Sequence, residues 1–438
     1  MTVLSASNHP GWESCGNGVL NEQQAAKLAE RHGTPLFLYD AAAMRCAVTS
    51  LRNALPPDAI LFYAVKANPV PGVIGVFAGM GLGAEVASAA ELDLALACGI
   101  PPEKIVFSGP AKTEAELEPA VMAGIYAVQA ESWDELQLLQ SICRSRELHA
   151  RVALRVNLGP NARGERRSGW GGVSPFGMDD ETLRHVVAHA HEVDRVRIIG
   201  VHHHLSSQSA TAEQLVERFD AFAQVALQLR AQLDLEFVNF GGGFAAPFYA
   251  DDRPLDLAPL RTYFLGLRQP EGRFGNWRPT IGVESGRYLT GPAGFYIARV
   301  ISIKRSFGVR FAFLDGGVHH ALGLSGAMRS LRRPVRAWRL GNPTAAPLEP
   351  TELAGPLCTP IDRLASAVDL PSDLRPGDLV VFANCGAYGK HASPLTFLGH
   401  DWPAEVLIDG PRASLVAPRM RCADLPGLRP GTHARVPI

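Results

Sequence analysis

Three residues of this chain have the chemistry of an active site, and each ends a run of mostly apolar residues. Lys66 follows residues 61–65, Glu284 follows residues 280–283, and His204 ends a third such run. The ammonium of a lysine at a strand end often reaches water while its stem packs on apolar surface. A lysine removed from water instead has a lowered pKa and can form a Schiff base with a carbonyl. Lys66 is therefore the first candidate for a covalent cofactor anchor.

Two further motifs supply groups that bind anions or pair with charges. Gly241-Gly242-Gly243 lacks Cβ atoms, so its backbone N–H groups could approach an anion closely. Glu284 lies three residues before Arg287. The two could form a structural ion pair. Alternatively, Glu284 could hold a ring nitrogen protonated while Arg287 binds an anion.

The run Gly200–Gln208 has two interpretations. Alternation along a strand places His202 and His204 on one face, as in barrel hydrolases that bind zinc. Alternatively, one imidazole stacks on a flat cofactor and Ser207 contacts its phosphate. A zinc site would need further ligands at other strand ends, where the sequence offers a lysine and two glutamates. The sequence therefore favours the cofactor and keeps zinc hydrolysis as an alternative.

The elements that must position these residues follow an alternating pattern. Apolar runs rich in β-branched residues recur eight times, with helix-like stretches between them. Eight such units over about 250 residues predict a closed (β/α)8 barrel, with a doubly wound open sheet as the alternative. Active sites of such barrels lie at the C-terminal strand ends, where the residues above are found. The predicted strands are Ile60–Lys66, Gly83–Ser88, Lys104–Gly109, Tyr126–Ala130, Arg151–Asn157, Val196–His204, Leu235–Gly241 and Thr280–Glu284.

The pattern changes in the last third of the chain, where short strand candidates separated by Pro and Gly predict a mostly antiparallel β-domain. Pro35–Tyr39 is a candidate member of the same domain, and Arg329–Pro350 is predicted to be a surface excursion. We therefore expect a barrel over residues 38–290 and a β-domain over residues 1–37 and 291–438. Its strand candidates are Ile297–Lys304, Arg310–Leu314, Leu379–Ala383, Ala404–Ile408 and Ser414–Pro418.

Composition and charge argue for a globular enzyme. The 438 residues are 47% hydrophobic and 19% charged, with a formal net charge of −1. This balance gives no electrostatic support for a nucleic-acid partner. The first residues show neither a secretory pattern nor a membrane span, so we expect a cytoplasmic protein without a membrane partner. Seven cysteines without a Cys-x-x-Cys pair are predicted to be free thiols.

Six stretches, in the expected order, resemble motifs of the fold-type III pyridoxal-phosphate decarboxylases, the family of diaminopimelate and ornithine decarboxylases. The match runs over nearly the whole chain, and the order of the motifs makes it specific. The stretches are Tyr63–Asn68 (the cofactor-lysine motif), Val201–Gln208 (His-x-His-Ile-Gly-Ser-Gln), Gly241–Phe244 (the phosphate loop), Glu284–Arg287 (Glu-Pro-Gly-Arg), Gly355–Cys358 (the cysteine of the partner's active site) and Gly386–Tyr388 (the tyrosine at the cofactor phosphate).

The resemblance implies an alanine-racemase-like barrel with a β-domain, and pyridoxal 5'-phosphate as cofactor. His204 would stack on the cofactor ring, and Glu284 would pair with its nitrogen. Cys358 would supply a proton to the second subunit's site, which implies a homodimer with shared sites. By residue type alone, Cys358 could be a small buried residue. The implied catalytic residues are Lys66, Cys358 and His204; the cofactor-binding residues are Lys66, Glu85, His204, Ser207, Gly241, Gly242, Gly243, Glu284, Gly286, Arg287 and Tyr388; the substrate-binding residues are Arg287, Cys358, Thr359, Asp362 and Tyr388.

Departures from the family concern the substrate. Thr359 stands where diaminopimelate decarboxylases have a glutamate, and ornithine decarboxylases an aspartate, that reads the distal end of the substrate. Residues 315–320, Asp-Gly-Gly-Val-His-His, together with Pro356–Pro360 and Pro403–Leu407, resemble a biosynthetic branch that acts on carrier-tethered glutamyl groups or conjugated amino acids. We therefore expect α-decarboxylation of a modified, conjugated or tethered amino acid in a secondary-metabolite or siderophore pathway.

Three alternatives stay open from the sequence. The first is a meso-diaminopimelate decarboxylase of lysine biosynthesis with a substituted distal reader. The second is an amino-acid racemase, which would need a tyrosine base in place of Cys358. The third is the zinc-dependent barrel hydrolase. Asp362, Arg163 and His320 are the candidates for contacts with the distal end of the substrate.

Overall fold

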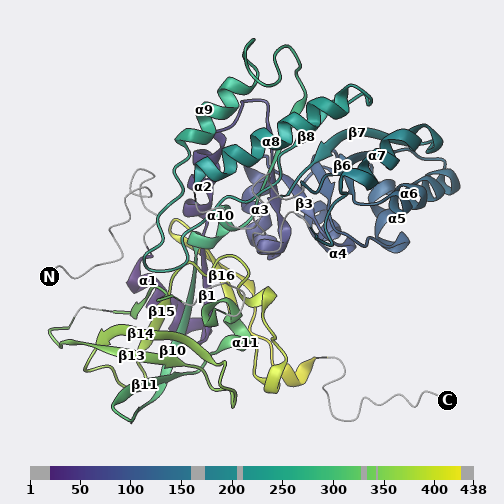
Figure 1. Cartoon of the computed structure of the whole chain (residues 1–438). Coiled ribbons are helices and arrows are strands. Elements are labelled where there is room, and N and C mark those ends of the chain that lie inside the picture. The colour runs from purple at the N-terminus through teal and green to yellow at the C-terminus, as the bar shows by residue number, and fades with distance from the viewer. Residues whose placement is uncertain (1–19, 159–172, 205–210, 327–332, 342–343, 426–438) are drawn as a thin grey trace, which may run out of the picture. The chain divides into compact units, whose positions relative to one another are not determined.

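The computed structural model divides the chain into two compact units, which we describe separately (Figure 1). The barrel unit comprises residues 45–246 and 254–289, and the β-unit comprises residues 1–44, 247–253 and 290–438. The structure describes residues 20–158, 173–204, 211–326, 333–341 and 344–425.

Eight parallel strands close the barrel in chain order. Phe62 on the first strand is paired with Glu284 on the last, and Ala64 is paired with Glu85 on the second. The predicted barrel is confirmed, and the open sheet is wrong. The strands are β2 (Ile60–Ala64), β3 (Gly83–Val86), β4 (Ile105–Phe107), β5 (Ala127–Ala130), β6 (Ala150–Arg155), β7 (Val196–His202), β8 (Phe237–Asn239) and β9 (Thr280–Ser285).

Helices begin soon after barrel strands because the sequence places capping residues there. The side chains of Ser88, Ser132 and Thr211 each accept the backbone N–H three residues later, which satisfies a donor that a helix start would leave without a partner. The helices are α2 (Ala41–Arg52), α3 (Pro71–Gly79), α4 (Ala89–Ala97), α5 (Glu114–Ala123), α6 (Trp133–Arg146), α7 (Asp180–His189), α8 (Ala212–Arg230), α9 (Ala258–Leu267) and α10 (Arg287–Thr290), with a 3-10 turn η2 (Val65–Ala67) after β2.

Aromatic side chains pack part of the barrel interior. The ring of Phe237 lies 6.4 Å from that of Phe62 and 4.8 Å from that of Tyr126. Glycines make room for these rings, since a Cβ at Gly83 would come within 2.7 Å of Phe62 and one at Gly282 within 2.8 Å of Phe237. The part of the barrel interior that these rings fill is therefore a packed core and not a channel.

The β-unit contains a nine-stranded sheet in the part of the chain that the structure describes. Six of its eight strand pairings are antiparallel, which confirms the predicted mostly antiparallel domain. The early strand β1 lies between β10 and β16, and α1 packs its apolar face on these strands. The elements are α1 (Glu22–His32), β1 (Leu36–Asp40), β10 (Gly294–Ser306), β11 (Val309–Leu314), α11 (Val318–Ala321), β12 (Ala337–Arg339), β13 (Leu348–Ala354), β14 (Arg363–Pro371), β15 (Leu379–Phe382), β16 (Ala404–Asp409) and β17 (Arg412–Ala417).

Two expectations about the β-unit and the cysteines are corrected. Arg329–Pro350 is not only a surface excursion, because it contains β12 and the start of β13, and the β13–β14 hairpin was not predicted at all. Cys46 is disulfide-bonded, so the prediction of free thiols is wrong there. The free cysteines among the described residues are Cys98, Cys143, Cys358, Cys385 and Cys422. In the same described part of the chain, no helix combines the length and apolarity needed to span a membrane.

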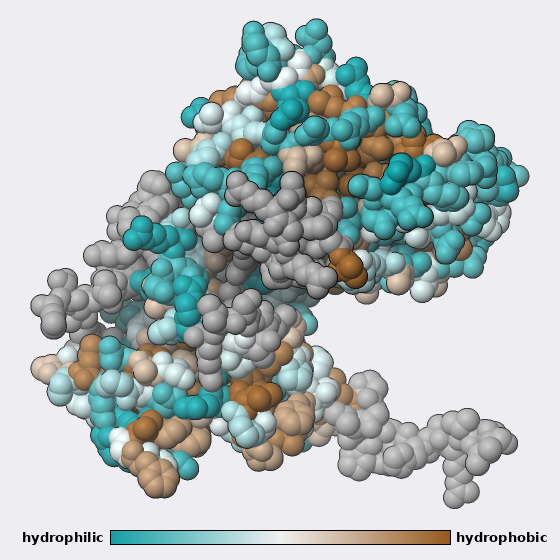
Figure 2. All heavy atoms as spheres, viewed as in Figure 1, coloured by the Kyte–Doolittle hydropathy of each residue, from teal (hydrophilic) through white to brown (hydrophobic). Residues whose placement is uncertain are grey.

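Exposed apolar side chains gather on one part of the β-unit. Ile301, Phe307, Val309 and Leu348 lie on or beside β10, β11 and β13, and Phe307 is fully exposed. Figure 2 shows brown and tan residues toward the bottom of the view, over the strands that Figure 1 labels β11 and β13. Large exposed apolar patches often mark contact surfaces.

Candidate active site

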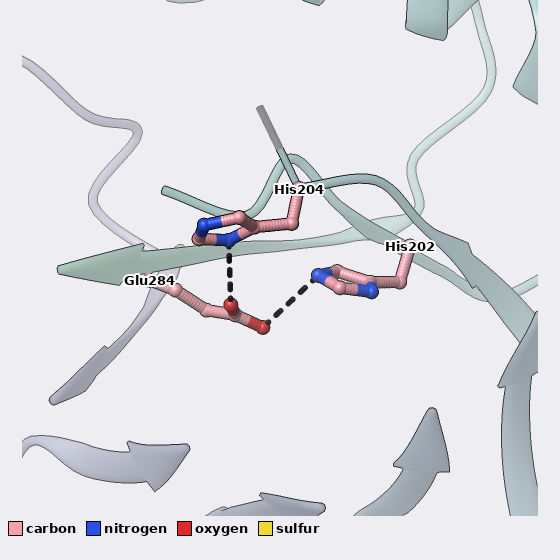
Figure 3. A group of neighbouring side chains, drawn as sticks. All are labelled: His202, His204 and Glu284. Atoms are coloured by element: carbon pink, nitrogen blue, oxygen red, sulfur yellow. Dashed lines mark ion pairs between the residues drawn. The ribbon is translucent and has the colours of Figure 1, made fainter. Parts of the chain in front are cut away.

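Glu284 is the centre of a buried polar cluster inside the barrel. Its Oε1 accepts hydrogen bonds from Gln129 Nε2 at 2.6 Å and from Asn239 Nδ2 at 2.8 Å. His202 Nε2 lies 3.3 Å from Oε1, and His204 Nδ1 lies 3.6 Å from Oε2 (Figure 3). Strands β5 and β8, and β7 with the residues just after it, therefore direct polar side chains at one carboxylate on β9.

This cluster carries one fixed negative charge. Burial alone would raise the pKa of Glu284, but His202 and then His204 outweigh burial and hold the pKa well below that of an ordinary glutamate. Burial lowers the pKa of His202, although the Glu284 carboxylate opposes that shift. At neutral pH we therefore take Glu284 as ionised.

Lys66 lies in the turn η2, directly after β2, and its Nζ forms an ion pair with Glu85 on β3. Glu85 is buried, whereas the Lys66 side chain is 36% exposed. The expectation of a buried amine is therefore only partly right. The 3-10 turn carries Lys66 beyond the strand end, where solvent reaches it, while Glu85 holds its amine at the C-terminal end of the neighbouring strand.

The glycine loop, residues 241–243, follows β8 and lies beside the polar cluster around Glu284. Gly241 and Gly243 have φ angles of 65° and 110°, which residues with a side chain rarely adopt. Asn239 Oδ1 accepts the Gly241 N–H at 2.9 Å, so the residue that bonds Glu284 also fixes the start of the loop. A Cβ at Gly242 would come within 3.1 Å of the His204 ring. The loop therefore presents backbone, without side chains, beside His204.

Gly286 and Arg287 follow Glu284 at the end of β9. A Cβ at Gly286 would come within 2.7 Å of the Ala67 Cβ, so only glycine lets this segment approach the turn that carries Lys66. Arg287 is the first residue of α10. The ends of β2 and β9, which are paired in the barrel, thereby bring the lysine and arginine segments together.

The remaining expected site residues belong to the β-unit. Cys358 is exposed, and Thr359 half-buried, in the loop that joins β13 to β14. Tyr388 has a φ of 53°, a backbone conformation that is strained for a tyrosine. Strain of this kind is often kept at functional sites.

Asp362 and His320 are buried in the β-unit. The Asp362 oxygens accept the N–H groups of Val318 at 2.8 Å and Leu357 at 2.7 Å. His320 Nε2 lies 2.9 Å from the Asp401 carbonyl, and its Nδ1 lies 3.3 Å from the Tyr296 hydroxyl. We therefore assign Asp362 and His320 structural roles, in place of the substrate contacts expected from the sequence.

The barrel unit thus brings most of the expected cofactor residues to the C-terminal ends of its strands. Cys358, Thr359, Asp362 and Tyr388 lie in the β-unit, and Ser207 and Arg163 lie outside the described residues. The expected residues found at the barrel strand ends are Lys66, Glu85, His204, Gly241, Gly242, Gly243, Glu284, Gly286 and Arg287.

Sequence reasoning missed Gln129 and Asn239. A single polar residue within Ala127-Val128-Gln129-Ala130 was an available signal, because a buried amide requires a hydrogen-bond partner. Asn239 was visible as the polar residue before the glycine loop. The sequence offered His202 as a metal ligand or as a structural histidine, and the structure places it against the carboxylate of Glu284.

The zinc alternative finds partial support in the geometry. His202, His204 and Glu284 are the one group among the described residues that could hold a metal, with ligand atoms within 4.8 Å of one another. Zinc bonds of about 2.0–2.2 Å would require tetrahedral ligands to lie closer, at about 3.5 Å. One carboxylate oxygen also already accepts two amide N–H groups. The cluster therefore suits a cationic N–H group better than a metal ion.

Comparison with known proteins identifies the family. The family model described as the pyridoxal-binding domain of pyridoxal-dependent decarboxylases matches residues 42–291. The chain is 35% identical over 398 residues to the L-glutamyl-[BtrI acyl-carrier protein] decarboxylase of Niallia circulans, covering 89% of this chain and 92% of that protein. It is 31% identical over 410 residues to the diaminopimelate decarboxylase of Pseudomonas aeruginosa, covering 91% and 94%.

A solved structure gives the same answer for the fold. The crystal structure of diaminopimelate decarboxylase from Helicobacter pylori complexed with L-lysine matches with a TM-score of 0.82 and 26% identity, covering 91% of this chain and 98% of that chain. The cofactor of such enzymes is pyridoxal 5'-phosphate. With the barrel, the strand-end lysine and the family match together, this chain belongs to the fold-type III pyridoxal-phosphate decarboxylases, a family of carboxy-lyases.

Proposed function

We propose that this enzyme removes the α-carboxylate of an amino acid that is modified, conjugated or tethered to a carrier protein. The observation that carries this choice of substrate is the loop 355–362, which holds Cys358. Its one charged residue, Asp362, is buried and bonds backbone N–H groups through both oxygens. The loop therefore offers no charge to a distal ammonium or carboxylate. The Niallia circulans relative is named for a carrier-bound glutamyl substrate, which agrees with this choice.

The barrel unit fits pyridoxal 5'-phosphate in three respects. The Lys66 amine is partly exposed at a strand end. Glu284 is a buried carboxylate held in its ionised form, which suits a protonated ring nitrogen. The glycine loop leaves no room for a side chain beside His204, so backbone N–H groups could face a phosphate there. When bound, the cofactor supplies an electron sink for the electron pair that the departing carboxylate leaves behind.

The residues of the chain divide this work as follows. We assign Lys66 as the covalent anchor, with Glu85 holding its amine in place. His204 would lie against the cofactor ring and Glu284 would bind its nitrogen. The residues assigned to the phosphate are Ser207, Gly241, Gly242, Gly243, Gly286, Arg287 and Tyr388.

Cys358 would donate a proton to the α-carbon in the site of a second subunit, which makes the active enzyme a homodimer with shared sites. Two features of the β-unit support this. The Cys358 side chain is exposed on its loop. Exposed apolar residues, among them Ile301, Val309 and Leu348, lie on neighbouring strands of the same sheet and suit a protein partner. The cytoplasmic location expected from the sequence stays a prediction.

The second candidate is decarboxylation of free meso-diaminopimelate. It is favoured by a similarity over 91% of the chain to the diaminopimelate decarboxylases of Pseudomonas aeruginosa and Helicobacter pylori. The residue that separates the two candidates is Thr359, because a charged reader is expected at that position for a free diamino acid. We do not propose the racemase or the zinc hydrolase, since the relatives named above are decarboxylases.

Carbon dioxide release tests the proposal with four substrates: carrier-bound glutamyl thioester, its pantetheine analogue, free L-glutamate and meso-diaminopimelate. We expect a thioester to be preferred over meso-diaminopimelate by at least about 100-fold in kcat/KM, since binding energy from the tether is used in catalysis. Thr359→Glu should raise turnover of meso-diaminopimelate, and Thr359→Gln, the uncharged control, should not. A kcat/KM of about 10⁴ M⁻¹s⁻¹ or more for meso-diaminopimelate with the unmodified enzyme would overturn the proposal.

A further inference from the structure

Gln129 makes a hydrogen bond across the barrel interior. Its strand, β5, stands opposite β9 in the closed ring of eight strands. Gln129 Nε2 nevertheless reaches Glu284 Oε1 at 2.6 Å, and the two residues are 155 positions apart in the chain. Gln129 is fully buried. A polar contact of this kind depends on barrel closure and is worth most where water is excluded.

The surrounding residues fix the orientation of this amide. An ionised carboxylate only accepts hydrogen bonds, so the NH2 end of Gln129 must face Glu284. At the other end of the amide, the Ser108 hydroxyl on the neighbouring segment after β4 donates to Gln129 Oε1. The buried Lys112 ammonium donates to the Gln129 main-chain carbonyl at 3.0 Å and pairs with Glu135 at 2.7 Å. Both ends of Gln129 are therefore held, and its N–H points at the carboxylate.

The two oxygens of Glu284 consequently have different surroundings. Oε1 accepts N–H groups from Gln129 and Asn239 and also faces His202. Oε2 faces the partly exposed ring of His204 at 3.6 Å. Donors on one oxygen stabilise the ionised carboxylate and leave the other oxygen as the acceptor for a ligand. The oxygen of each amide has another partner, which is Ser108 for Gln129 and the Gly241 N–H for Asn239. A change at Gln129 therefore tests the donor to Glu284 without disturbing the glycine loop.

We propose that Gln129 is a positioning residue, which keeps Glu284 ionised and turns Oε2 toward the ring nitrogen of pyridoxal 5'-phosphate. This inference rests on the proposed pairing of Glu284 with that nitrogen. Because its amide is bonded to Ser108 and Glu284, Gln129 would act through Glu284 and not on the cofactor directly. Ser108 acts one step farther away, by giving the Gln129 amide oxygen a hydrogen-bond partner and so holding the amide in place.

The first test replaces the donor and measures cofactor binding by fluorescence titration of the cofactor-free protein. Gln129→Leu keeps a side chain of similar size without branching at Cβ but removes one charged hydrogen bond, so the dissociation constant should rise about 10-fold or more. Ser108→Ala removes the partner of the Gln129 amide oxygen and leaves the amide less firmly held, so it should cause a smaller rise. Gln140→Leu on α6 is the matched control, because the Gln140 amide accepts the Asp194 N–H at 2.6 Å and has no part in the cluster.

The second test separates positioning from a structural role by its pH dependence. Gln129→Glu places a second carboxyl against Glu284, and two carboxyls this close share a proton. At pH 6 the introduced carboxyl keeps that proton and donates as the amide did, so affinity should stay near that of the unmodified protein. At pH 8.5 both groups ionise and repel, and affinity relative to the unmodified protein should fall at least about 10-fold. Gln129→Leu should be weak at both pH values.

The outcomes distinguish the inference from the assignment on which it rests. Unchanged affinity in Gln129→Leu, or a Gln129→Glu variant whose relative affinity is flat with pH, overturns the role of Gln129. If Glu284→Gln also binds the cofactor normally, the pairing of Glu284 with the ring nitrogen is what fails. Should Gln129→Leu not fold, as judged by thermal unfolding, Gln129→Glu and Ser108→Ala carry the test. Equal weakening in Gln140→Leu would also refute a specific role.

Discussion

Asp362→Ala is predicted to loosen the loop that carries Cys358. The Asp362 carboxylate accepts one N–H from Val318, at the turn after β11, and one from Leu357, next to Cys358. Gly317 and Gly355 close over it, and a Cβ on either glycine would overlap the carboxylate. This single side chain therefore ties the Cys358 loop to the turn that begins α11.

The size of the effect follows from the two N–H groups. Each would lose its acceptor in a buried place, at about 1–3 kcal/mol. Burial raises the pKa of Asp362, although the Val318 and Leu357 N–H groups oppose that shift, so the folded protein gives up some stability to hold this charge. We expect a net loss of about 2–4 kcal/mol in the free energy of unfolding. Asp362→Asn keeps one acceptor but sets an NH2 group against a backbone N–H, and should lose about 1–3 kcal/mol.

Thermal unfolding and steady-state kinetics of the same variants check this prediction. A loss of 2–4 kcal/mol in a unit of this size corresponds to a Tm lower by roughly 5–15 °C. The exposed Asp369 on β14 supplies the control, and Asp369→Ala should change Tm little. An unchanged Tm in Asp362→Ala would refute the hydrogen-bond reasoning. A lower Tm with unchanged kcat, measured well below both unfolding transitions, would refute the claim that Asp362 positions Cys358.

Two other predictions concern the subunits and the response to acid. If sites are shared, mixing Lys66→Ala with Cys358→Ala should restore about a quarter of the wild-type activity. Half of the randomly exchanged dimers are mixed, and each mixed dimer has one intact site out of two. No recovery of activity after proven subunit exchange would exclude shared sites. Burial lowers the pKa of His203 to about 3, of His319 to about 4 and of His320 to about 2. Below pH 6.5 the unfolded chain therefore takes up protons that the folded chain does not, and stability should fall by about 1.4 kcal/mol per pH unit for each imidazole. A urea midpoint that is equal at pH 7 and pH 5 would contradict this.

The barrel could be predicted because its signal is local. Each strand is a short apolar run, and residues such as Ser88 and Ser132 mark the helix starts that follow. The β13–β14 hairpin carried no such signal. Leu348–Ala354 mixes two glutamates and Pro350 with apolar residues, because one face of this strand is exposed. A strand of that kind is stabilised by its neighbours more than by its own composition.

The site was predictable in its charged residues and not in the contacts between them. Lys66, His204 and Glu284 could be found because a charged or imidazole side chain ends an apolar run. The amide of Gln129 could not be assigned to Glu284, because the contact exists only once β5 and β9 stand on opposite sides of a closed ring. The exposure of Lys66 depends on one 3-10 turn, which a short motif does not specify.

The position of β1 has a consequence for how the protein is made. The Tyr39 hydroxyl on β1 donates to Glu405 on β16 at 2.6 Å, across 366 positions of sequence. The ribosome therefore releases β1 long before β16, its parallel neighbour, exists. The barrel strands between them can pair earlier, since all eight are complete by residue 285. Until the final strands emerge, β1 has an open edge that other chains could pair with, and chaperones would be most needed in that interval.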